Sequence, residues 1–280
     1  MFGLLNIYKP VGMTSHDVVS ALRRLTKIKQ IGHTGTLDPF AEGVLPVCIG
    51  KATRLIEFLP DDKEYLATVQ FGSATTTYDT EGEITFSSDK KVSKEDIINA
   101  LKNFEGEIEQ LPPIYSAIKV NGKKLYDYAR QGQEVEIKPR KVIIEKIELK
   151  SFDEDLQQAE VLIKCSKGTY IRSIAHDLGQ YLSVGGHLIK LVRTQAGKFR
   201  VEKSIRLDGL EVEKNLINPI NILDLPQFEV EEDDLEKIKN GMPLKMKFPG
   251  NNFCVLVYNS QICAIGFSDC DKINLKKVFI

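Results

Sequence analysis

The chain has 280 residues, of which 42% are hydrophobic and 28% are charged, and its formal net charge is −1. This composition is typical of a globular protein and excludes the disordered and fibrous classes. Without an apolar run of 18 residues or an N-terminal segment of the secretory type, the sequence predicts a cytoplasmic protein that does not span a membrane.

The neutral total conceals an uneven distribution of charge. Residues 61–110 carry a net charge of −7, whereas residues 1–60 carry +3 and residues 111–150 carry +4. Basic regions of this kind can follow a phosphate backbone, although charge also fluctuates along any globular chain.

Hydrophobic periodicity and turn residues divide the first half of the chain into alternating strands and helices. Asp96 follows Ser93 by three residues, which is a variant of the helix capping box. From the N-terminus, the predicted elements are a strand at residues 4–8, a helix at 18–25, mostly loop at 31–50, a strand at 65–71 and a helix from 93 to about 104.

The second half is richer in strands. Its predicted elements are a hairpin at residues 114–122 around Asn121-Gly122, strands at 142–149 and 159–165, a helix at 170–181 and a mixed or strand segment at 188–199. Because strands outnumber helices and the two interleave, the sequence predicts an α+β fold with a largely antiparallel sheet.

Proline punctuation near residues 219–226 predicts a boundary between two parts of the chain. Residues 1–225 would form the main domain. An acidic amphipathic helix at residues 230–239 and short apolar runs such as 253–258 then predict a small, mostly β unit at residues 226–280. A unit of this size is expected to pack on the main domain.

Several familiar sites are excluded by spacing. The five cysteines contain no CxxC pair and the four histidines no HxxxH pair, which argues against disulfide frameworks and zinc sites. Residues 32–54 contain neither a P-loop nor a GxGxxG fingerprint. They hold one acid before a proline, Asp38, which on this pattern is either a turn residue or a carboxylate at the mouth of a cleft.

A set of motifs resembles the TruB family of tRNA pseudouridine synthases, which isomerise uridine 55 in the T-loop. The motifs follow the family order over about 190 residues. They are NIYKP with GMTS at residues 6–15, GHTGTLDP at 32–39, GVLP at 43–46, GKATR at 50–54, KEY at 63–65, GTYIRS at 168–173 and LVRT at 191–194.

The resemblance implies a pseudouridine-synthase fold and a role for each matching residue. Asp38 would be the catalytic carboxylate, and Arg172 would pair with it and lower its pKa. Tyr65 would stack on the uracil and take the proton from its carbon 5. Tyr170 would line the same pocket, and Leu191 would supply an apolar wall. No cofactor and no metal are implied.

The resemblance also implies RNA contacts, since a base must leave its stack before it can react. His33 would fill the space that the base leaves, and Lys9 would support the active-site loop or a phosphate. A hairpin insertion at about residues 111–140 would grip the RNA stem-loop. Its basic residues include Lys119, Lys123, Lys124 and Arg130.

The leading hypothesis is therefore a stand-alone tRNA uridine-55 isomerase that acts as a monomer without an obligatory protein partner. One alternative is a guide-RNA-dependent synthase of the same superfamily. Another is an RNA-binding protein that folds tRNA without catalysis. Residues 226–280 resemble an RNA-binding PUA-like module, for which residues 240–244 are suggestive.

Overall fold

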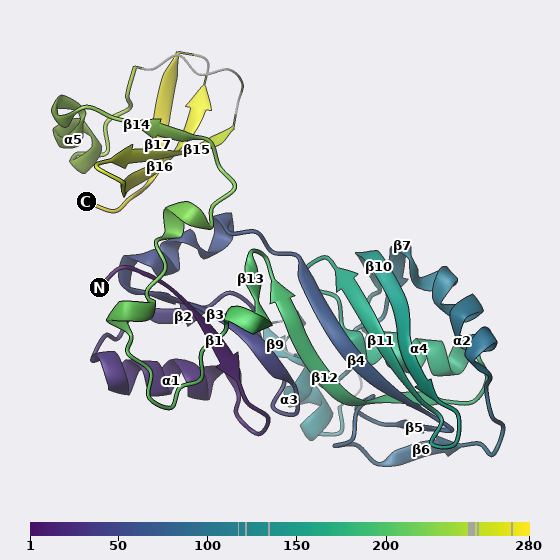
Figure 1. The fold of residues 1–280 in the computed structure, drawn as a ribbon. Helices are drawn as coiled ribbons and strands as arrows, with labels where there is room; N and C mark the ends of the chain where they lie inside the picture. The colour runs from purple at the N-terminus through teal and green to yellow at the C-terminus, as the bar shows by residue number, and fades with distance from the viewer. Residues whose placement is uncertain (117, 121, 134, 246–249, 251, 270) are drawn as a thin grey trace.

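A computed structural model describes the chain from residue 1 to residue 280, except for residues 117, 121, 134, 246–249, 251 and 270. It contains a large mixed sheet flanked by helices and a small four-stranded sheet near the C-terminus (Figure 1). The α+β class predicted from the sequence is therefore confirmed.

The large sheet runs in the order β1-β3-β12-β4-β11-β10-β7, with β2 paired to β3 and β13 paired to β12. Every pairing is antiparallel except that of β3 with β12. The strands are β1 (Gly3–Lys9), β2 (Ile31–His33), β3 (Glu42–Ile49), β4 (Lys63–Phe71), β7 (Gly106–Gln110), β10 (Arg140–Asp153), β11 (Gln158–Cys165), β12 (Gly186–Ala196) and β13 (Phe199–Arg200).

Helices α1 (Ser15–Thr26), α2 (Lys94–Leu101) and α4 (Ile171–Tyr181) flank this sheet. Capping boxes begin two of them, because Thr14 and Asp17 bond reciprocally at α1, and Ser93 and Asp96 do so at α2. The 3-10 helices are η1 (Gly50–Phe58), η2 (Lys102–Phe104), η3 (Val201–Lys203), η4 (Glu213–Asn215) and η5 (Pro219–Asn221).

Helix α4 approaches β12 very closely. A Cβ atom on Gly179 would lie 2.1 Å from the backbone nitrogen of Gly186, so neither position has room for a side chain. This contact holds the last turn of α4 against the start of β12, and Arg172, in the first turn of the same helix, is buried. The close approach therefore helps to position the site described below.

Residues 31–50 were expected to be mostly loop, and that prediction is wrong. They form β2 and β3, and only residues 34–41 between them are irregular. The Gly and Pro residues of β3 misled the prediction. Gly43 adopts a φ of +107° at the start of the strand, and Pro46 is tolerated within it.

The insertion between β7 and β10 contains less regular secondary structure than predicted. It contains the two-residue strands β8 (Lys119–Val120) and β9 (Lys123–Lys124) and the short helix α3 (Leu125–Arg130). Residues 114–116 are not a strand, and Asn121 of the expected turn lies outside the described residues. A separate hairpin, which was not predicted, pairs β5 (Ser73–Thr75) with β6 (Ile84–Ser87).

The C-terminal part consists of the sheet β14-β15-β16-β17 and helix α5 (Glu232–Lys239). Its strands are β14 (Gln227–Glu229), β15 (Phe253–Tyr258), β16 (Gln261–Asp269) and β17 (Lys272–Val278). One buried apolar cluster contains residues of both parts, such as Leu4 and Leu55 with Ile262 and Phe279. The small sheet thus shares a core with the large one.

None of the helices within the described residues is long and apolar enough to cross a membrane.

Candidate active site

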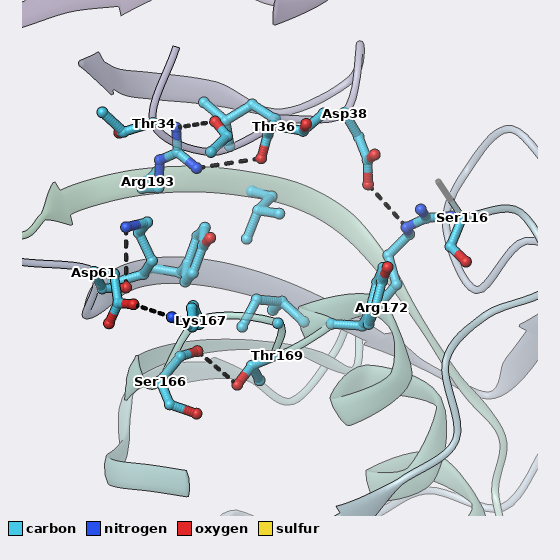
Figure 2. A pocket seen from close by; sticks show the side chains of 18 of the residues that line it. Thr34, Thr36, Asp38, Asp61, Ser116, Ser166, Lys167, Thr169, Arg172 and Arg193 are labelled. Atoms are coloured by element: carbon cyan, nitrogen blue, oxygen red, sulfur yellow. Dashed lines mark hydrogen bonds and ion pairs between the residues drawn. The ribbon is translucent and has the colours of Figure 1, made fainter. Parts of the chain in front are cut away.

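A cavity of about 470 Å³ opens at the centre of the large sheet (Figure 2). It lies between the loop that joins β2 to β3 and the segment that joins β11 to α4. Asp38, Tyr65, Tyr170, Arg172 and Leu191 all line it. The structure therefore brings together the five residues that the sequence predicted for the catalytic pocket, although they come from four segments distant in the chain.

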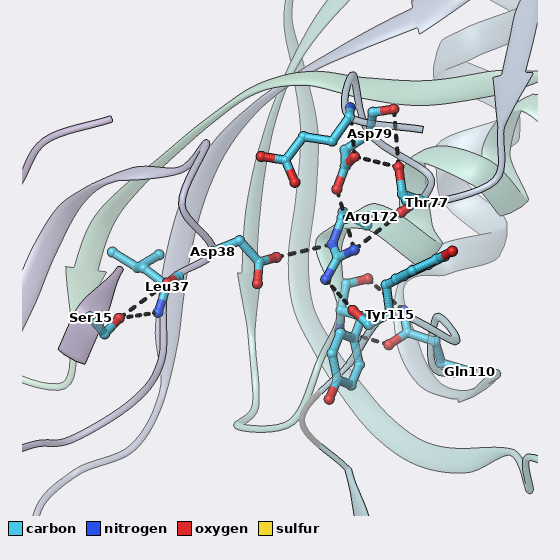
Figure 3. Close-up of polar contacts among 10 residues, drawn as sticks. Ser15, Leu37, Asp38, Thr77, Asp79, Gln110, Tyr115 and Arg172 are labelled. Carbon is cyan, nitrogen blue, oxygen red and sulfur yellow. Dashed lines mark hydrogen bonds and ion pairs between the residues drawn. The ribbon is translucent and has the colours of Figure 1, made fainter. Parts of the chain in front are cut away.

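The loop that carries Asp38 is held by side chains from several other elements. The hydroxyl of Ser15, at the start of α1, accepts from the Leu37 amide at 2.8 Å and donates to the Leu37 carbonyl at 3.1 Å (Figure 3). The Gly12 amide donates to the Pro39 carbonyl at 2.8 Å. These bonds fix the backbone on both sides of Asp38.

Arg193, on β12, fixes the other half of this loop. Its guanidinium donates to the carbonyl of Val44 at 2.7 Å, that of Gly35 at 3.1 Å and that of Thr36 at 3.2 Å. The side chain is almost completely buried. A planar fork of donors suits three carbonyls at once, which a lysine could not match.

Arg172 joins two carboxylates in the cavity wall. Its Nε atom lies 3.0 Å from Oδ2 of Asp38, and its NH1 atom lies 3.3 Å from Oδ2 of Asp79 (Figure 3). It also donates to the carbonyls of Thr77 at 3.2 Å and Tyr115 at 3.0 Å. Asp79 is buried, whereas the side chain of Asp38 remains 37% exposed toward the cavity. Asp38 is thus the accessible end of an ion-pair chain whose other carboxylate is buried.

The pKa of Asp38 is set by burial and by its charged neighbours. Burial raises it above its usual value, and this effect outweighs the neighbouring Arg172, which acts in the opposite direction. The second carboxylate, Asp79, also raises the pKa of Asp38 because its negative charge disfavours a second ionised carboxylate nearby. Arg172 thus pairs with Asp38 and lowers its pKa as expected, but burial, which the sequence did not reveal, has the larger effect.

Two tyrosines and a leucine complete the cavity. Tyr65 belongs to β4 and is paired in register with Arg193 of β12, and burial raises the pKa of its phenol. The backbone amide and carbonyl of Tyr170 both bond to the side-chain amide of Gln110. Leu191 is buried. The apolar sides of these residues can hold a flat ring above Asp38.

Lys9 takes one of the two roles considered for it. It is completely buried, and its ammonium donates to the carbonyls of Met13 at 2.7 Å, Pro10 at 2.9 Å and Pro39 at 3.4 Å. It supports the Asp38 loop and does not face a solvent-exposed phosphate. Burial lowers the pKa of Lys9 to about 8, while Asp38 acts in the opposite direction.

His33 lies at the end of β2, next to the cavity residue Thr34. It is half-buried, and burial lowers the pKa of its ring, so the ring is neutral near pH 7. A neutral flat ring beside the cavity mouth is suited to stacking.

The basic residues predicted for RNA binding lie in the insertion. Lys123 approaches Gln131 and lies 4.4 Å from the centre of the Tyr128 ring, and Lys124 donates to the Tyr126 hydroxyl at 3.1 Å. The side chains of Lys119 and Arg130 lie outside the part that the structure describes.

Three residues of the site were not predicted to act there. Arg193 belongs to the LVRT motif, so the sequence contained a signal for it. Ser15 belongs to the GMTS motif, to which no role at the site was assigned. Asp79 gave no signal, because it is one of twelve acids in residues 61–110 and only the fold places it beside Arg172.

Among the described residues, no group of three or more His, Cys, Asp or Glu side chains is placed to hold a metal ion. Cys48, Cys165, Cys254 and Cys263 are buried free thiols.

Comparison with known proteins agrees with this geometry. Residues 23–171 match the model of the TruB family pseudouridylate synthase N-terminal domain, and residues 172–218 match that of the tRNA pseudouridylate synthase B C-terminal domain. Neither range reaches the small sheet.

Curated relatives match most of the chain. A protein of Caldanaerobacter subterraneus subsp. tengcongensis is 42% identical, with 99% of each chain covered, and one of Carboxydothermus hydrogenoformans is 45% identical, with 100% of this chain and 99% of the relative covered. One of Clostridioides difficile is 51% identical over 75% of this chain and 70% of the relative. All three are described as tRNA pseudouridine synthase B.

Solved structures show the same fold. The structure of a Cbf5-Nop10-Gar1 complex matches with a TM-score of 0.75 and 26% identity, covering 100% of this chain and 85% of the other. An H/ACA RNP bound to a substrate RNA containing 2′-deoxyuridine matches with a TM-score of 0.74 and 25% identity, with the same coverage. Given the family models and the full-length relatives, the chain belongs to the TruB family of pseudouridylate synthases.

Proposed function

We propose that this chain converts uridine 55 in the T-loop of tRNA to pseudouridine, with Asp38 as the catalytic carboxylate. The observation that carries the proposal is the ion pair of Asp38 with Arg172, 3.0 Å long, in the wall of a cavity large enough for a nucleoside. The names of the full-length relatives support tRNA as the substrate.

The reaction replaces a carbon–nitrogen bond between ribose and uracil with a carbon–carbon bond. The bond between ribose C1′ and uracil N1 breaks, the base turns, and a bond between C1′ and C5 forms. The C5 proton leaves and N1 gains a proton, so no oxidant and no energy source is needed. Asp38 would either attack C1′ or take a proton from C2′, and both routes need its ionised form.

The surrounding residues would hold the base and move its proton. Tyr65 would stack on the uracil and accept the C5 proton, directly or through water. Tyr170 and Leu191 would close the other sides of the cavity. Because the target lies inside a folded loop, the base must flip out first, and His33 would stack in the space that it leaves.

A guide-RNA-dependent synthase remains the alternative within the superfamily, because the matching solved structures are named as Cbf5 and H/ACA assemblies. Their identity to this chain is 25–26%, whereas the full-length relatives described as tRNA pseudouridine synthase B reach 42–45%. The higher identity favours the stand-alone enzyme.

The test uses the purified full chain and an unmodified T-arm stem-loop transcript, without added protein, guide RNA, cofactor or metal. We expect pseudouridine at position 55, mapped at nucleotide resolution. A transcript with cytidine at position 55 is the matched control and should remain unmodified. Modification at another uridine would contradict the proposed position, and RNA binding without modification would favour the non-catalytic alternative.

A further inference from the structure

A stacked pair of rings lies behind the Arg172–Asp79 ion pair. The rings of Tyr78 and His176 have centroids 3.9 Å apart and planes inclined by only 15°. Neither residue belongs to the motifs of the active site.

The positions of the two rings connect them to the site. Tyr78 lies between Thr77, whose carbonyl accepts a hydrogen bond from Arg172, and Asp79, whose carboxylate pairs with Arg172. His176 lies four residues after Arg172 in α4, and residues four apart share one face of a helix. The ring stack therefore joins the same two segments as the ion pair.

The backbone of Tyr78 is held in an uncommon conformation. Its φ is +64°, which an aromatic residue rarely adopts because of its Cβ atom. Its amide donates to the Thr75 carbonyl at 3.3 Å, and its carbonyl accepts from the Leu188 amide at 2.9 Å. Strain of this kind persists where the surroundings over-determine the backbone, and it often occurs at functional sites.

The imidazole of His176 is held by the stack and not by a hydrogen bond at Nδ1. That atom is buried and has no hydrogen-bond partner within the described part of the chain. Burial also lowers the pKa of His176, so the ring is neutral near pH 7. The ring face is thus the contact through which this side chain acts on the loop.

We propose that Tyr78 and His176 are positioning residues for catalysis. Their stack fixes the loop that carries Asp79, and Asp79 in turn sets where Arg172 meets Asp38. The inference rests on the proposed function, since it assigns the stack a role in the rate of that reaction. It predicts that ring contact is required and that the imidazole nitrogens are not.

The experiment measures single-turnover rates and RNA affinity with the T-arm transcript for four variants. His176→Ala removes one ring, and Tyr78→Gly removes the other while it tolerates the positive φ. Both should lower the rate constant about tenfold or more and leave the dissociation constant within about twofold. His176→Phe and Tyr78→Phe keep the stack and should react within about twofold of the wild type.

A second comparison tests the path of action. In an Asp79→Asn background, His176→Ala should cause little further loss, because residues that act through one another are not additive. Tyr181→Ala is the matched control, since this exposed aromatic on the same helix packs against Phe104 and not near Arg172. It should change the rate little even if it lowers the unfolding temperature.

Distinct results overturn distinct statements. A wild type without pseudouridine activity contradicts the proposed function itself. An active wild type with a His176→Ala variant of equal rate contradicts only the positioning role. If the rate losses of His176→Ala and Asp79→Asn multiply in the double variant, the stack does not act through Asp79. If His176→Ala does not fold, His176→Gln removes the ring with less loss of volume, and a wild-type rate for it again excludes the role.

Discussion

At the scale of single residues, the site is built on a carboxylate whose ionised form the fold disfavours. Burial raises the pKa of Asp38, which means that the folded chain holds this proton more tightly than the unfolded chain does. Ionising Asp38 therefore costs folding free energy at every pH above its pKa. Arg172 offsets part of the cost, and it shares its charge with Asp79.

This cost gives a prediction for Asp38→Asn. The variant should lose activity by at least about a thousandfold, because an amide cannot act as the carboxylate does, and its unfolding temperature at pH 7 should equal or exceed that of the wild type. Arg172 would still have Asp79 as a partner. Quantification of pseudouridine checks the loss of activity, and thermal unfolding checks the stability. A variant that is both inactive and strongly destabilised would show that Asp38 is structural.

A second prediction concerns pH. Because Asp38 must be ionised and its pKa is raised, the reaction should slow as the pH falls through a value above about 4, the usual pKa of an aspartate. Asp79→Asn removes the competing carboxylate, so the pKa of Asp38 should fall. The decline of the rate at acidic pH should then move to lower pH. The maximal rate should also fall, since Arg172 loses an anchor. Single-turnover rates from pH 4 to pH 8 test this prediction. A decline that moves to higher pH in Asp79→Asn contradicts it.

At the scale of elements, the junction of β3 with β12 brings the Asp38 loop to the rest of the site. These strands pair in parallel only at Val192 with Glu42 and Arg193 with Gly43. A Cβ atom on Gly43 would lie 2.3 Å from the Arg193 carbonyl oxygen, and its φ of +107° disfavours other residues as well. The absence of a side chain there allows Arg193 to reach the loop carbonyls.

Gly43→Ala should therefore disturb both stability and activity. We expect a loss of about 3 kcal/mol in the free energy of unfolding, together with a lower rate, because the strands must separate. Gly106→Ala is the matched control, since Gly106 also has a positive φ of +92° but open space around it. It should cost only about 1 kcal/mol and leave the rate unchanged. Equal losses for the two variants, measured by denaturant unfolding, would contradict the argument.

The elements that the sequence predicted well are those with local signals. The capping box at Ser93 marked the start of α2, apolar spacing marked α1 from residue 18 although the helix begins at Ser15, and the alternation of β4 identified a strand with one buried face. Asp38, Tyr65 and Arg172 were found because family motifs mark them. Asp79 and the strand nature of β3 were missed because both depend on contacts with distant segments, which no local pattern records.

At the scale of the whole molecule, the acidic and basic regions belong to different elements that meet at one strand pair. Of the twelve acids in residues 61–110, five lie in β4, α2 and β7 and seven lie outside these elements, whereas the basic residues of 111–150 belong to the insertion and to β10, which pairs with β7. The C-terminal sheet shares a buried cluster with the large sheet, and Lys277 pairs with Glu57 across the two at 2.9 Å. A net charge of −1 is therefore compatible with a local basic surface.

The last prediction tests that surface through salt. If Lys123 and Lys124 meet phosphates, the logarithm of the T-arm affinity should fall linearly with the logarithm of salt concentration, and the Lys123→Gln/Lys124→Gln variant should reduce the slope by about 1–2. Its affinity should also be lower at low salt. Lys94→Gln/Lys102→Gln, at the two ends of helix α2 in the acidic stretch, is the matched control and should leave the slope unchanged. Equal slopes for the two double variants would show that Lys123 and Lys124 do not meet phosphates.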